Sequence, residues 1–319
     1  ISLPDSLTTI GMGAFNSCHS LENVTIPDSV MEIGDVAFRG DGNLELTVCS
    51  SRFTFDGICL IDNVSHRLLC CCKKNVYSYD MPDSVRAIGM SAFNYCTSLK
   101  RITLPDSLIS IGRNAFYGCS SLERITIPRS VTEIGVDAFH ECNIDLEVLS
   151  PAFSFDGTCL VDETSHIVMM CCKKDVVTYK TPDSVTEIGA EAFSDCGSLE
   201  SVTLSDSVVS LGKNAFSKCC SLQNVTLPDK LIEIGDEAFY DCSSLQIVTL
   251  PDTITRIGEK AFVYCSSLRT IKVPDSLTEA GDNVFGYGDS LESIFIPRGT
   301  REKFEELLPE YDYKLVEVD

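Results

Sequence analysis

The stretch LQNVTLPDKLIEIGDEAFYDC, residues 222–242, decides the fold because it is one copy of a unit that recurs along the chain. Its first part, Leu222–Leu227, ends in an alternation of apolar and polar residues rich in β-branched side chains, which predicts a short strand. Pro228 ends that strand because proline cannot donate a hydrogen bond to a sheet ladder. The Ala-Phe pair and Cys242 then follow at the spacing of one turn of a short helix.

The unit repeats with a period of 23 residues. One copy cannot bury its apolar residues alone, but stacked copies align them into continuous internal ladders. The Ala-Phe pair occurs ten times if Val284-Phe285 is included, which predicts a solenoid of ten turns. The proline position is occupied by Pro4, Pro27, Pro82, Pro105, Pro128, Pro182, Ser205, Pro228, Pro251, Pro274 and Pro297.

Two longer gaps interrupt this period, between Pro27 and Pro82 and between Pro128 and Pro182. The residues in the two gaps match one another at an offset of 100, and each gap contains an Asp-Gly pair flanked by apolar runs. Asp-Gly in that setting is a hairpin signal. The sequence therefore predicts one solenoid over residues 1–297 with β-hairpin inserts near 49–80 and 149–180.

Composition excludes several classes of partner. The chain has 47 acidic and 25 basic residues and a net charge of −22. Such a surface repels phosphate backbones and anionic lipids, so neither nucleic acid nor a membrane surface is expected as a partner. No apolar run reaches the roughly 18 residues that a membrane span needs, and no signal peptide is recognisable. Because the first residues already belong to a repeat, we expect a fragment or a processed form.

The 17 cysteines fall into two groups. Eight stand three residues after the repeat phenylalanine, where we expect them to be reduced and buried, as free cysteine often is. These are Cys18, Cys96, Cys119, Cys142, Cys196, Cys219, Cys242 and Cys265. The insert cysteines near His66 and His166 lack the spacing of a zinc site, so no metal is predicted. Buried thiols or an exposed redox-active thiol remain as alternatives there.

The sequence predicts no enzyme and no cofactor. No histidine stands in a known nucleophile motif, and no phosphate-binding loop or nucleophile elbow occurs. A row of aspartates at the Pro-Asp-Ser turn could collect calcium, as in β-helix repeats. The competing interpretation is that these aspartates accept backbone N–H bonds and fix the turn.

Ligand contacts are predicted on the strands. The valine and the last leucine of each strand face the core, so the positions before and between them face the concave surface. One of these positions is nearly always threonine, which cross-strand packing explains. The other varies, and variation within a constant frame is where a solenoid can encode recognition. For any single position the alternative is an ordinary solvated residue. The predicted contacts are Asn23, Arg101, Arg124, Ser201, Asn224, Ile247, Thr270, Lys272, Ser293 and Phe295.

The unit L-x-x-V-T-L-P-D-S-V-x-x-I-G-x-x-A-F-x-x-C closely resembles the BspA-like, or Treponema-type, leucine-rich-repeat family over nearly the whole chain. The predicted fold class is therefore α/β: a right-handed leucine-rich-repeat solenoid with a parallel concave β-sheet and short helices on the convex side. The resemblance implies that residues 298–319 form a C-terminal cap.

The family also implies export to, or display on, the surface of a host-associated microbe. The resulting hypothesis is a cell-surface or secreted module that binds a protein, such as a host extracellular matrix protein, through its concave sheet or hairpin inserts. The alternative is a passive structural spacer with no ligand of its own. No oligomeric state is predicted.

Overall fold

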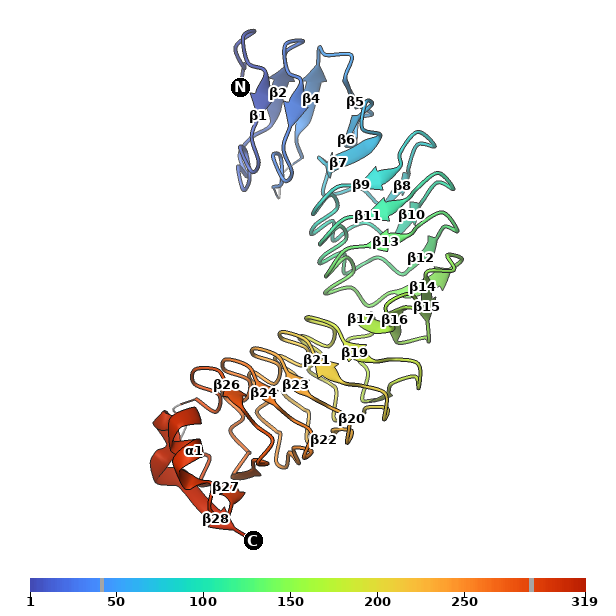
Figure 1. The fold of residues 1–319 in the computed structure, drawn as a ribbon. Helices are drawn as coiled ribbons and strands as arrows, with labels where there is room; N and C mark the ends of the chain where they lie inside the picture. Colours follow the sequence, from blue (N-terminus) through green and yellow to red (C-terminus); the bar gives the residue numbers. More distant parts are fainter. Residues whose placement is uncertain (41–42, 287–289) are drawn as a thin grey trace. The chain divides into compact units, whose positions relative to one another are not determined.

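The chain forms stacked coils in which a longer strand and a shorter strand alternate (Figure 1). The computed structural model describes residues 1–40, 43–286 and 290–319. These residues form two compact units, Ile1–Gly157 and Thr158–Asp319. No described helix is both long and apolar enough to cross a bilayer.

The first unit contains two parallel sheets of longer strands and a ladder of short ones. The longer strands are β2 (Asn23–Ile26), β4 (Glu45–Val48), β8 (Ser78–Asp80), β10 (Arg101–Thr103), β12 (Arg124–Ile127) and β14 (Asp145–Val148). The short strands are β1 (Thr9–Ile10), β3 (Glu32–Ile33), β9 (Ala87–Ile88), β11 (Ser110–Ile111) and β13 (Glu133–Ile134). The remaining strands, in the insert regions, are β5 (Phe53–Phe55), β6 (Cys59–Asp62), β7 (Arg67–Cys71) and β15 (Phe153–Phe155).

The second unit repeats this arrangement and ends in a cap. Its insert strands are β16 (Cys159–Asp162) and β17 (Ile167–Cys171). The longer strands are β18 (Thr178–Lys180), β20 (Ser201–Thr203), β22 (Asn224–Thr226), β25 (Thr270–Lys272) and β27 (Ser293–Pro297). The short strands are β19 (Glu187–Ile188), β21 (Ser210–Leu211), β23 (Glu233–Ile234), β24 (Arg256–Ile257) and β26 (Glu279–Ala280). The cap comprises α1 (Arg301–Leu307), η1 (Pro309–Lys314) and β28 (Leu315–Val318), which pairs with β27.

Strand register and core packing confirm the solenoid and its hairpin inserts. Neighbouring longer strands pair in parallel one repeat apart, as Val202 does with Val225. In the inserts β6–β7 and β16–β17 pair in antiparallel fashion. The repeat phenylalanines stack face to face in both units, with ring centroids 5.2 Å apart for Phe93 and Phe116. Because these rings are buried, apart from the half-buried Phe15, the ladder supplies much of the apolar core.

The prediction of short helices on the convex side is wrong. The Ala-Phe segments form stacked turns, and the only α-helix among the described residues is α1 in the cap. Most of the regular coils have left-handed backbone at two positions, for example Asn114 (φ 55°) and Gly118 (φ 69°), which interrupts a right-handed helix. The Phe116 N–H instead donates to the Ala138 carbonyl in the next coil, at 2.8 Å. Such bonds between coils offset the conformational cost of the left-handed residues.

The described residues make about 13 turns, more than the ten predicted. The ten Ala-Phe coils account for the predicted number. The additional turns are the two insert-bearing coils and the final coil containing β27. The sequence pattern did not predict them because they lack the Ala-Phe pair.

The glycine that follows the short strand allows neighbouring coils to approach closely. A Cβ atom at Gly112 would lie 2.7 Å from the carbonyl oxygen of Ile88, and one at Gly212 would lie 2.6 Å from the backbone nitrogen of Ala190. Both contacts are with backbone atoms of the preceding coil. Glycine is therefore required here for stacking.

Candidate binding surface

The outward positions of the longer strands form what we call the sheet face of each unit. In the first unit it is divided between the β2–β4 sheet and the sheet of β8, β10, β12 and β14. Alternation along the strands creates it: in β10, Arg101 and Thr103 are exposed while Ile102 between them is buried. Asn23 is likewise exposed at the start of β2, where it lies opposite Glu45 of β4.

Arg101 and Arg124 are direct partners across β10 and β12 in the first unit. Arg124 is about two-thirds exposed and lies 3.9 Å from a carboxylate oxygen of Glu147. Arg101 has no ion pair with any residue in the described part of the chain. Like charges directly opposite one another destabilise a sheet, and among the described residues only Arg124 of the two has a compensating carboxylate.

A shallow hollow of about 490 Å³ lies over this pair. Besides the two arginines, its walls include Lys100 and Glu123, whose charged groups are 3.8 Å apart. The Lys100 ammonium also lies 5.5 Å from the centre of the Tyr77 ring. The hollow therefore presents three cationic side chains beside acidic ones.

The threonines of the same sheet face have internal partners. The Thr103 hydroxyl donates to Asp80 at 2.8 Å, and the Thr126 hydroxyl donates to Glu147 at 3.0 Å. Sequence reasoning missed both acidic partners because they lie on β8 and β14. The inserts break the 23-residue spacing in these coils, so the strand register could not be assigned from the sequence. These threonines are consequently less available to a ligand than the arginines.

The second unit presents a largely uncharged sheet face. Ser201 pairs with Asn224, which in turn pairs with Ile247, one of the most exposed apolar residues at 66%. The other predicted contacts lie nearer the cap, where β25 and β27 pair Thr270 with Ser293 and Lys272 with Phe295. Ser293 and Phe295 are half-buried rather than exposed.

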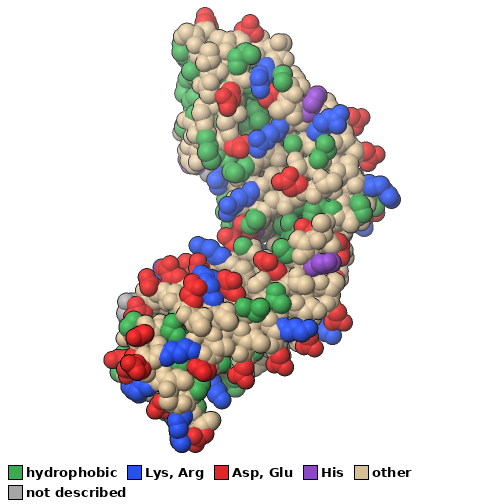
Figure 2. Space-filling model, in the orientation of Figure 1, with side chains coloured by type: hydrophobic (Ala, Val, Ile, Leu, Met, Phe, Trp, Pro, Cys, Tyr) green, Lys and Arg blue, Asp and Glu red, His purple; other side chains and the backbone are tan. Residues whose placement is uncertain are grey.

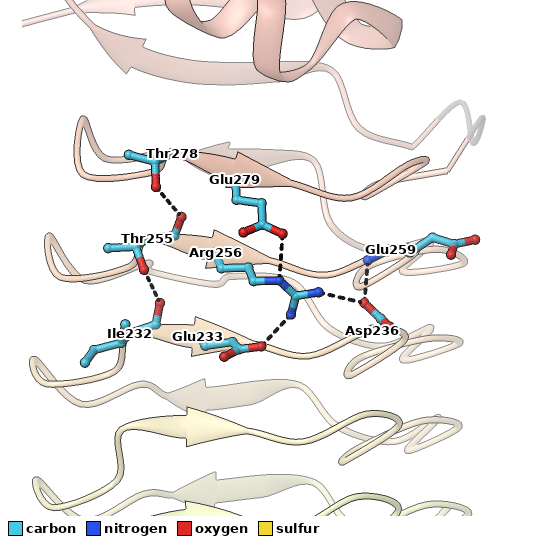
Figure 3. Close-up of polar contacts among 8 residues, drawn as sticks. All are labelled: Ile232, Glu233, Asp236, Thr255, Arg256, Glu259, Thr278 and Glu279. Atoms are coloured by element: carbon cyan, nitrogen blue, oxygen red, sulfur yellow. Dashed lines mark hydrogen bonds and ion pairs between the residues drawn. The ribbon is translucent and has the colours of Figure 1, made fainter.

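Acidic and basic side chains intermingle on the face of each unit drawn in Figure 2. The short strands of the second unit show how such charges pair (Figure 3). Arg256 binds Glu233 and lies 3.1 Å from Glu279 and 3.5 Å from Asp236. The hydrogen bond to Glu279, together with Glu233, raises the pKa of Arg256. Sequence reasoning missed this network, although an arginine at a position that other repeats fill with glutamate was its signal.

In the inserts, one aspartate organises each hairpin turn. Asp62 Oδ1 accepts hydrogen bonds from the backbone of Val64, at 2.9 Å, and Ser65, at 3.3 Å. Arg52 adds an ion pair at 3.0 Å. Burial acts to raise the pKa of Asp62, but the backbone and arginine hydrogen bonds outweigh it and lower that pKa. Asp162 has the same backbone bonds and a lowered pKa.

The cysteine ladder is buried except at its first position: Cys18 is exposed, contrary to prediction. The equivalent residue of the next coil is Asp41, so no thiol continues the ladder there. Buried ladder thiols donate to the phenylalanine carbonyl of the preceding coil, as Cys119 does to Phe93 at 3.0 Å. Burial raises the pKa of Cys265 to about 12. The ladder is therefore held in the thiol form.

Each insert adds thiols and a lysine to this ladder. In the first, the Cys59 and Cys71 strand positions are paired, and Lys74 Nζ lies 3.7 Å from the Cys96 sulfur. In the second, Lys174 Nζ lies at the same distance from Cys196. No group of side chains suited to a metal ion occurs in residues 1–40, 43–286 or 290–319.

The hydrogen bonds at the Pro-Asp-Ser turns come from backbone and hydroxyl groups. The Val30 N–H donates to the Pro27 carbonyl at 3.2 Å, and the Ser29 hydroxyl donates to the Leu7 carbonyl of the preceding coil at 2.7 Å. One aspartate of the row, Asp275, pairs with Lys303 at 3.0 Å.

Comparisons with known proteins identify close structural relatives. A family model described as the BspA type leucine rich repeat region matches residues 1–58, 63–151 and 171–307, in six copies. The crystal structure of a leucine rich cell surface protein from Faecalibacterium prausnitzii is 30% identical, with a TM-score of 0.72, over 96% of this chain and 80% of that one. The pneumococcal vaccine antigen PcpA has the same fold at 20% identity, with a TM-score of 0.65, over 99% of this chain and 86% of its own. No curated protein matches the chain.

Proposed function

The chain belongs to the BspA-type leucine-rich-repeat family, and from this premise we propose that it is a surface-displayed or secreted adhesin-like module. Leucine-rich-repeat domains commonly bind proteins, and the match over most of the chain makes that general class the starting point. The similar Faecalibacterium protein is described as a cell surface protein, which supports the proposed location.

The ligand site that we propose is the sheet face of the first unit, centred on Arg101 and Arg124. The observation that carries it is that two exposed arginines are direct partners on neighbouring strands and line one hollow. A guanidinium presents a planar fork of donors that matches a carboxylate. A ligand carboxylate placed between the two groups would relieve their mutual repulsion.

The ligand class that follows is a protein with an exposed acidic segment, host extracellular matrix proteins included. At long range the chain's net charge of −22 works against such a partner. Recognition therefore has to come from short contacts at the arginine pair. Among the other predicted positions, we propose Asn23, which is also exposed in the first unit, as a further contact.

Binding to a panel of matrix proteins, including fibronectin and fibrinogen, tests this proposal. The wild type is compared with the Arg101→Glu, Arg124→Glu double variant. The matched control is Ser201→Glu, Asn224→Glu, which places the same two charges on the equivalent strands of the second unit. Saturable binding that only the first variant loses would support the proposed site.

Two other outcomes would count against it. Binding kept by the Arg101→Glu, Arg124→Glu variant would point to the hairpin inserts. No saturable binding to any member of the panel would favour the alternative function, a passive structural spacer without a ligand of its own.

A further inference from the structure

Cys70, near the end of β7, and Cys72, the residue just after that strand, form a close pair of thiols. Their sulfur atoms are 3.6 Å apart and share a hydrogen bond. The side chains converge because residues two apart on a strand point to the same face. Both are buried, at 6% and 3% exposure, in the core around the first insert, so each is held next to the other.

The pair belongs to the first insert alone. The two inserts match closely at an offset of 100: Cys71 corresponds to Cys171, Cys72 to Cys172, and both runs continue into two lysines. At the position of Cys70 the second insert has Met170, which is equally buried. The fold therefore accepts an unreactive side chain at this position, and packing alone does not require the second thiol.

A small hollow lies beside one member of the pair. Cys72 lines a hollow of about 20 Å³ that Phe15 and the exposed Cys18 also line. A space of at least about 10–15 Å³ holds one water molecule. A hydrogen peroxide molecule is only slightly larger than water, so a small oxidant fits in the hollow that Cys72 and its neighbour Cys71 line.

We propose that Cys70 and Cys72 are a redox-active dithiol that hydrogen peroxide oxidises to a disulfide. The Cys72 sulfur attacks one peroxide oxygen, the O–O bond breaks, and Cys72 sulfenic acid and one water form. The Cys70 sulfur then attacks the Cys72 sulfur, the S–O bond breaks, and the hydroxyl leaves as a second water with the Cys70 proton. Peroxide gains the two electrons that the two thiols lose.

The resulting bond is reversible. Residues two apart on a strand have Cα atoms about 6.6 Å apart, close to the upper end of the range that disulfides span. A disulfide at that limit is strained and therefore readily reduced. The hydrogen bond with Cys70 and burial raise the pKa of Cys72, so the thiol form dominates and the first step is slow.

Mass spectrometry of the full chain tests the proposal. The reduced protein is exposed to hydrogen peroxide, its remaining thiols are alkylated, and the peptides are sequenced. The peptide that contains residues 70–72 is expected to lose two hydrogens. Cys71 should be alkylated, whereas Cys70 and Cys72 should not be. Dithiothreitol should restore both thiols. The equivalent peptide of the second insert serves as the internal control and keeps both cysteines alkylated.

The Cys70→Met variant gives the first insert the residue of the second and should abolish the change without altering the circular dichroism spectrum. Cys70→Ala provides a second variant if methionine packs badly. The proposal is wrong if Cys70 and Cys72 of the wild type are still alkylated when the exposed Cys18 and Cys49 are fully oxidised. A Cys18–Cys72 or Cys59–Cys71 disulfide in its place would also overturn it.

Discussion

The two inserts, residues 49–80 and 149–180, share a frame but differ in single side chains. In both, the cysteine two residues before the first lysine donates its thiol to that lysine's carbonyl. Cys71 donates to Lys73 at 3.2 Å, and Cys171 donates to Lys173 at 3.1 Å. Both also have a left-handed histidine in the hairpin turn, at His66 (φ 56°) and His166 (φ 61°). We take the features present in both copies to be the structural frame of an insert, that is, the contacts that attach it to the neighbouring coils.

The differences concern groups that the frame does not need. The first insert has Cys70 where the second has Met170, and Arg52 where the second has Ala152. The first therefore contains a thiol pair and an ion pair that those positions of the second cannot form. Shared groups should consequently give matched effects on mutation, and unshared groups should give effects in one unit only.

The largest matched effect is expected in the phenylalanine ladder. Phe116→Ala and Phe216→Ala each remove a fully buried ring stacked on two neighbours, at a cost of about 3–5 kcal/mol. Hydrogen exchange of the surrounding coils measures each loss locally. Tyr313→Ala, at an exposed ring, is the control with little expected effect. A loss of stability several-fold larger in one unit than in the other would show that the two ladders are not equivalent.

A smaller matched effect is expected at the insert lysines. Lys74 Nζ donates to the Asn94 carbonyl, and Lys174 Nζ donates to the Ser194 carbonyl at 2.6 Å. Methionine at either position keeps the aliphatic packing but leaves a carbonyl unsatisfied, at a cost of about 1–3 kcal/mol. The exposed Lys218→Met is the control in the same exchange measurement. Unchanged protection around Asn94 and Ser194 in the variants would contradict this role.

The smallest effect should differ between the inserts. The lowered pKa of Asp62 means that its carboxylate stabilises the fold above its usual pKa of 3.8, and that this stability is lost as pH falls through the folded value. Asp62→Asn should remove this acid sensitivity and also the bond to Arg52, worth about 1 kcal/mol near neutral pH. Asp162→Asn should cost less, since Ala152 offers no charge. Equal pH profiles for both variants would refute the distinction.

Much of the fold was predictable because a 23-residue period determines both which residues of neighbouring coils align and which residues are buried. The alternation that exposes Arg101 and buries Ile102 follows from strand geometry alone. The absence of convex helices was not predictable from spacing, because Phe116 and Cys119 lie as close on two stacked turns as on a helix. What excludes the helix is left-handed backbone at Asn114 and Gly118. Asparagine and glycine both favour that conformation, but other repeats have residues such as Glu237 and Lys218 there, which give no such signal.

The candidate site was predictable only in part. The pairing of Arg101 with Arg124 follows from the period, and the structure places them side by side. Their acidic neighbour Glu147 could not be placed, because it stands in a coil that the insert lengthens. The contact between Cys70 and Cys72 depends on side-chain directions just after a bulge, because the pairing register between β6 and β7 shifts between Leu68 and Cys70.

The most direct test of the proposed binding role exchanges the variable residues between the two sheet faces. Arg101→Ser, Arg124→Asn gives the first unit the residues of the second, and Ser201→Arg, Asn224→Arg does the reverse. The measurement is the Kd for the protein ligand that the panel identifies. We predict that the first exchange weakens binding at least about tenfold, a loss of about 1.4 kcal/mol, and that the second does not weaken it. An unchanged Kd for the first exchange would contradict a binding site on the sheet face of the first unit.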